Sequence, residues 1–150
     1  MKKTVLALAI VYVLPFYFAF MNWQNYAWFI GGFCIGLGLM LLDELVFYKQ
    51  YAGATPKALE LISRSPLFLV AFPILAFFAI TSSTSALGVG LVLGIGLTMV
   101  AEAIALRRNQ GQLRQRFAQH LSASLDDQEI RRWLWVGIII FSVLSGLVFL

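Results

Sequence analysis

The sequence predicts an all-α integral membrane protein with five transmembrane helices, its N-terminus inside and its C-terminus outside. Three observations support this: an apolar composition, five long apolar segments, and basic residues confined to alternate connections between them. Of the 150 residues, 61% are hydrophobic and 12% are charged. Soluble domains are about half apolar and about a quarter charged. Lipid is therefore the expected solvent for most of the chain.

Five segments are long or apolar enough to be transmembrane helices, which need about 17–25 predominantly apolar residues. The third is the shortest, so a re-entrant hairpin with the fourth stays an alternative, but a full span keeps the charges in alternation. The first follows two lysines, as in a signal peptide, yet it is long and no small-x-small cleavage site ends it, so we expect it to be retained. The segments are 4–21, 26–48, 66–81, 86–106 and 133–150.

The charges predict the topology. All 11 basic residues lie in alternate connections, while NWQN at 22–25 and SSTS at 82–85 carry no charge. Basic residues near span ends stay cytoplasmic, which predicts the N-in, C-out arrangement. The net charge of +4 then needs no nucleic-acid partner, and attraction to anionic headgroups on the cytoplasmic side follows. The expected location is a cell membrane, multi-pass, of the bacterial inner-membrane kind.

Two of the basic connections are expected to form short amphipathic helices at the cytoplasmic surface. Thr55 and Pro56 suit an N-cap and a first helical position, which predicts a helix over 56–63. In QLRQRFAQHLSAS, apolar residues recur every four positions among polar neighbours, from Leu113 to Leu121. That pattern is typical of a helix lying on a membrane surface.

An ungapped match at a spacing of 58 residues predicts a tandem, parallel repeat of a helical hairpin. Residues 11–50 align with 69–108, and seven of the 40 pairs are identical, among them one proline, three glycines and one glutamate. Accidental alignment of two glycine-rich helices is the alternative. Each unit crosses the membrane twice, so both copies share one orientation. We therefore expect a single membrane domain with units 1–64 and 65–122 and a fifth span within 123–150.

Small residues are the candidates for helix packing. Gly32 and Gly36 in the second predicted span, and Gly90 and Gly94 in the fourth, form small-xxx-small ridges that let helices approach closely. Cys34 is the single cysteine of the sequence, and we expect it to be a small packing residue. No metal-ligand cluster, catalytic triad or phosphate-binding loop is visible, so neither a cofactor nor an enzymatic activity is expected.

Two prolines and two acids occupy matching positions inside the predicted spans. Pro15 and Pro73 each remove a backbone N–H and are expected to kink their helices, as static kinks or as hinges. Glu44 and Glu102 lie near the inner boundary, each on the ridge of its glycines, which favours a face toward neighbouring helices. An intramembrane acid is a candidate cation, proton or pairing site. The alternative is structural: each acid reaches the interface or pairs with a nearby base.

These features favour a non-enzymatic membrane subunit or scaffold that acts through helix–helix assembly. The expected partners are the lipid bilayer, anionic headgroups, and either a second copy or another membrane protein. The alternative function is a small oligomeric transporter or channel for an ion or proton. In that case Glu44 and Glu102 lie on its path.

Overall fold

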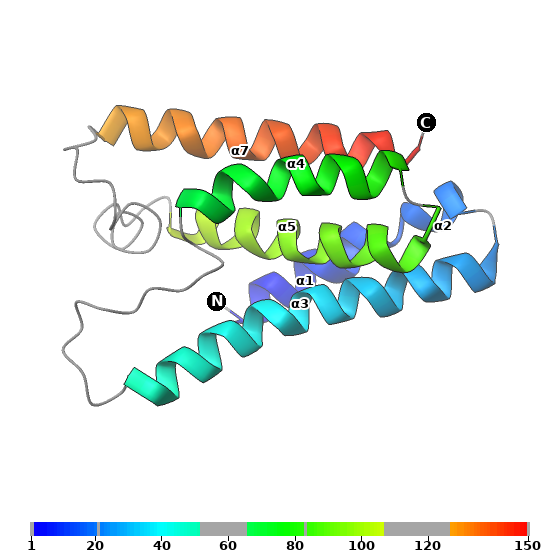
Figure 1. The fold of residues 1–150 in the computed structure, drawn as a ribbon, viewed down its shortest axis with the longest axis horizontal. Helices are drawn as coiled ribbons and strands as arrows, with labels where there is room; N and C mark the ends of the chain where they lie inside the picture. Colours follow the sequence, from blue (N-terminus) through cyan, green and yellow to red (C-terminus); the bar gives the residue numbers. More distant parts are fainter. Residues whose placement is uncertain (1, 21, 52–65, 83, 107–126, 150) are drawn as a thin grey trace.

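The computed structural model describes residues 2–20, 22–51, 66–82, 84–106 and 127–149. Within these ranges every regular element is an α-helix, which confirms the predicted all-α class. The short surface helices predicted at 56–63 and 113–121 lie outside the described residues. The helices are α1 (Lys2–Val13), α2 (Phe16–Phe20), α3 (Trp23–Tyr51), α4 (Pro66–Ser82), α5 (Ala86–Leu106) and α7 (Asp127–Leu147) (Figure 1).

Two stretches of helix are long and apolar enough to cross a membrane by length and composition. They are Trp23–Leu42 in α3 and Ala86–Ala105 in α5, each of 20 residues. At about 1.5 Å of rise per residue, such a helix matches the hydrocarbon thickness of about 30 Å. Three further apolar helical stretches are shorter: Ala7–Phe20, Val70–Ser82 and Arg132–Leu147.

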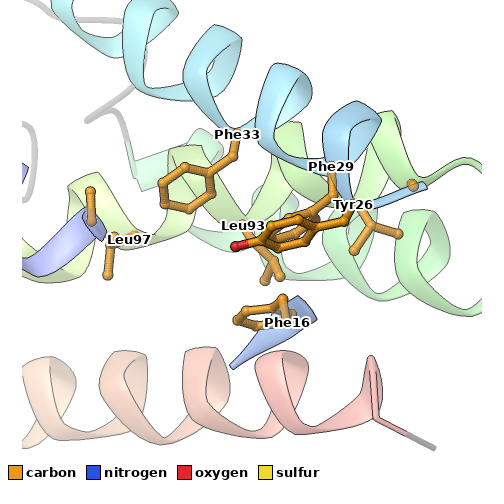
Figure 2. Packing of buried hydrophobic residues seen from close by; sticks show 9 residues of the cluster. Phe16, Tyr26, Phe29, Phe33, Leu93 and Leu97 are labelled. Carbon is orange, nitrogen blue, oxygen red and sulfur yellow. The ribbon is translucent and has the colours of Figure 1, made fainter. Parts of the chain in front are cut away.

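The helices surround α5. It lies beside α3 over most of its length and also contacts α4, α7 and α1, while α2 packs on α3 and α7 packs on α4. α3 and α5 run in the same direction, and α7 runs opposite to both (Figure 1). The buried core lies among α1, α2, α3 and α5, where Phe16, Phe29 and Phe33 gather around Leu93 and Leu97 (Figure 2).

The matched prolines have different surroundings. The first predicted span is divided at Leu14–Pro15, since α1 ends before this pair and α2 begins after it. The amides of Tyr17 and Phe18 bond back only three residues there, at 3.3 and 3.1 Å. Pro73 instead lies inside the continuous helix α4. The two aligned segments therefore differ in backbone at a position where both have proline.

Side chains cap the two helices that follow the uncharged connections. The Oδ1 of Asn22 accepts a hydrogen bond from the amide of Gln24 at 3.0 Å, at the start of α3. The Oγ of Ser85 accepts one from the amide of Gly88 at 3.3 Å, at the start of α5. Both residue types are favoured N-caps because they satisfy amides that the first helical turn leaves free.

Candidate functional site

The candidate site is built on the contact between α3 and α5. A Cβ added to Gly32 would stand 2.8 Å from the carbonyl carbon of Leu87, and one added to Gly90 would stand 2.9 Å from that of Phe29. The neighbouring atoms belong to backbone, so no side chain can move aside to make room. Only glycine therefore permits this approach at these two positions.

The second pair of predicted glycines continues the same contact one turn further along. A Cβ on Gly36 would lie 3.1 Å from the carbonyl carbon of Leu91, and one on Gly94 would lie 3.2 Å from that of Phe33. Both chains of contacts advance by four residues on each helix, as expected for parallel helices. The structure thus brings Gly32, Gly36, Gly90 and Gly94 together in one interface.

The contacts of this interface are reciprocal. Gly32 meets Leu87 on one side, and Gly90 meets Phe29 on the other. Gly90 follows Gly32 by 58 residues, and Leu87 follows Phe29 by the same 58. The second pair of contacts has the same relation. In a twofold dimer, each contact between residues of two subunits recurs with the subunits exchanged, and α3 and α5 show that pattern within one chain.

The two matched acids are described to different extents. Glu102 is 2% exposed on α5 and is the buried charged residue of the described part of the chain. It continues the ridge of Gly94 and Thr98, and the Thr98 hydroxyl donates to the Gly94 carbonyl at 2.9 Å. Glu44 belongs to α3, and its side chain lies outside the described residues. Glu102 therefore faces protein rather than the surface of the bundle.

Polar contacts between α1 and α7 were not predicted. The Tyr12 hydroxyl is hydrogen-bonded to the Ser145 hydroxyl, and Ser145 donates to the Phe141 carbonyl at 2.8 Å. Tyr12 is therefore the donor to Ser145. Its ring also stacks on Phe141 and Phe33, with centroids 5.5 and 6.0 Å apart. Tyr12 of α1 thus contacts both α7 and α3 at one level of the bundle.

A second tyrosine supports the break near Pro15. The Tyr26 hydroxyl donates to the Val13 carbonyl at 3.3 Å, where α1 ends. A helix end in an apolar setting leaves carbonyls without helical partners, and each unsatisfied group there is costly. Tyr26 is buried in the core, so its hydroxyl reaches a carbonyl that water would otherwise have to satisfy.

Other candidate features are modest. Cys34 is exposed on α3, so the expectation that it packs against a neighbour was wrong. In the described residues no group of three His, Cys, Asp or Glu could hold a metal ion. A hollow of about 240 Å³ opens where the ends of α2, α4 and α7 meet the start of α5. It is lined by Phe20, Ile80, Thr84, Ser85, Ala86, Val89, Leu147 and Val148.

No protein-family model matches the chain, and neither curated proteins nor solved structures give a match. A function for the chain therefore rests on its own residues: the glycine contact, the buried glutamate and the apolar surfaces around them.

Proposed function

We propose that the chain is a membrane subunit or scaffold that acts through helix–helix assembly and is not an enzyme. The supporting observation is the uneven covering of α3. One face of this helix packs backbone to backbone on α5, while another face carries exposed large apolar side chains, among them Trp28, Ile35 and Leu39. Extended exposed apolar surface marks contact with lipid or with another protein.

The proposal includes the five-span, N-in and C-out topology in a cell membrane. Its support is two helices long enough to span, three shorter apolar helices, and the alternation of basic and uncharged connections. It also includes the tandem repeat of 11–50 and 69–108. The reciprocal contacts of Gly32 with Leu87 and Gly90 with Phe29 support that repeat, since a pseudo-twofold axis along the membrane normal relates parallel repeats.

The second candidate is a small oligomeric transporter or channel for an ion or proton, with Glu44 and Glu102 on its path. The burial of Glu102 inside a helix bundle favours the transporter. Burying an acid within a membrane costs free energy, so such an acid is by default a candidate functional residue. Assembly is the first proposal because its glycine contact is described on both helices, whereas the side chain of Glu44 lies outside the described residues.

One experiment separates the two candidates. The protein is cross-linked in its native membrane and then purified, and the same protein is reconstituted in liposomes for ion and proton flux. A scaffold gives a stable complex, with itself or with another membrane protein, and no flux above empty liposomes. A transporter gives flux that Glu44→Gln with Glu102→Gln abolishes. Glu129→Gln, at an exposed carboxylate near the start of α7, is the matched control and should change neither result.

A chain that is monomeric in the membrane and that conducts ions or protons would overturn the assembly proposal. A complex without flux would overturn the transport alternative. Anionic headgroups are tested in the same liposomes, since the basic cytoplasmic connections predict tighter binding to vesicles with anionic lipid than to neutral ones.

A further inference from the structure

We draw no further inference here: the strongest candidate, the exposed apolar face of α3 that carries Trp28, Ile35 and Leu39, supports no proposal because nothing in the structure shows what covers it.

Discussion

Four glycines set how closely α3 and α5 approach. Hydrophobic burial does not drive helices together in lipid, so close packing of backbones and side chains has to do so. At Gly32 and Gly90 the nearest neighbours are backbone carbonyls of Leu87 and Phe29. A methyl group there would push the two helices apart along their whole contact rather than displace one side chain.

Gly90→Ala should therefore destabilise the fold. The new Cβ would lie within 2.9 Å of the Phe29 carbonyl carbon, and overpacking of this kind costs about 1–3 kcal/mol. The measurement is unfolding in detergent, monitored by tryptophan fluorescence. Gly137→Ala, where a Cβ meets nothing within 4 Å, is the matched control. Equal stability of the two variants would show that the α3–α5 contact is looser than the structure has it.

Single residues were predictable from the sequence only where a local motif reports its own geometry. A small-xxx-small ridge indicates which side of its helix packs, so Gly32, Gly36, Gly90 and Gly94 could be selected from the sequence. The Tyr12 contact joins residues 133 positions apart in the sequence, and no local pattern contains it. Cys34 was misjudged because helical periodicity shows that a face is small and apolar, not whether a neighbour covers it.

At the scale of elements, α7 lies outside the two aligned segments, 11–50 and 69–108, and a few contacts attach it. Phe141 packs on Gly96, and Ser145 accepts the hydroxyl hydrogen of Tyr12. Hydrogen bonds between membrane helices contribute about 0.6 kcal/mol on average and up to about 1.7 kcal/mol. The polar contact thus fixes the position of α7 while the packing contributes most of the attraction.

A double-mutant cycle measures that contact. Tyr12→Phe and Ser145→Ala each remove one partner, so their coupling energy in detergent unfolding should fall in the range of about 0.6–1.7 kcal/mol. Ser142→Ala is the matched control, since Ser142 is exposed on the same helix and donates to its own Ile138 carbonyl at 2.8 Å. Coupling of Tyr12→Phe with Ser142→Ala should be zero. Equal coupling in the two cycles would rule out a specific bond to Ser145.

The extents of α3, α4 and α5 were predicted to within three residues at each end because long apolar runs are local signals. The local sequence did not predict that the helix breaks at Pro15 but continues through Pro73. α1 and α2 separate at Pro15, and the Tyr26 hydroxyl satisfies the Val13 carbonyl at the break. In the alignment at a spacing of 58 residues, Tyr26 is matched by Thr84, whose side chain is too short for that reach, and α4 continues through Pro73.

At the scale of the whole molecule, the chain is symmetric at its centre and asymmetric at its edge. Each glycine contact between α3 and α5 recurs with the two helices exchanged, but α1, α4 and α7 all contact α5. The composition and the alternating charges predict the direction of each span. They do not predict this asymmetry, because it depends on which helices pack on α5, and some of these contacts join segments far apart in the sequence.

The direction of the spans is testable at the α4–α5 turn. Thr84 is exposed in this turn, and the five-span topology places it outside the cell. In a Cys34→Ser background, Thr84→Cys in intact cells should therefore react with a membrane-impermeant thiol reagent, as Asn22→Cys should. A cysteine at Asn109, in a basic connection, should react only after the membrane is opened.

A re-entrant hairpin formed by the third and fourth segments gives a different pattern. Its turn stays within the membrane, so Thr84→Cys would remain unlabelled in intact cells while Asn22→Cys reacts. Labelling of Asn109→Cys in intact cells would show that the basic connections lie outside, so that the orientation of the chain is opposite to the predicted one. The reagent thus tests orientation and the crossing of α4 separately. The crossing of α4 matters most, because a pseudo-twofold pair of hairpins requires that both units cross the membrane twice.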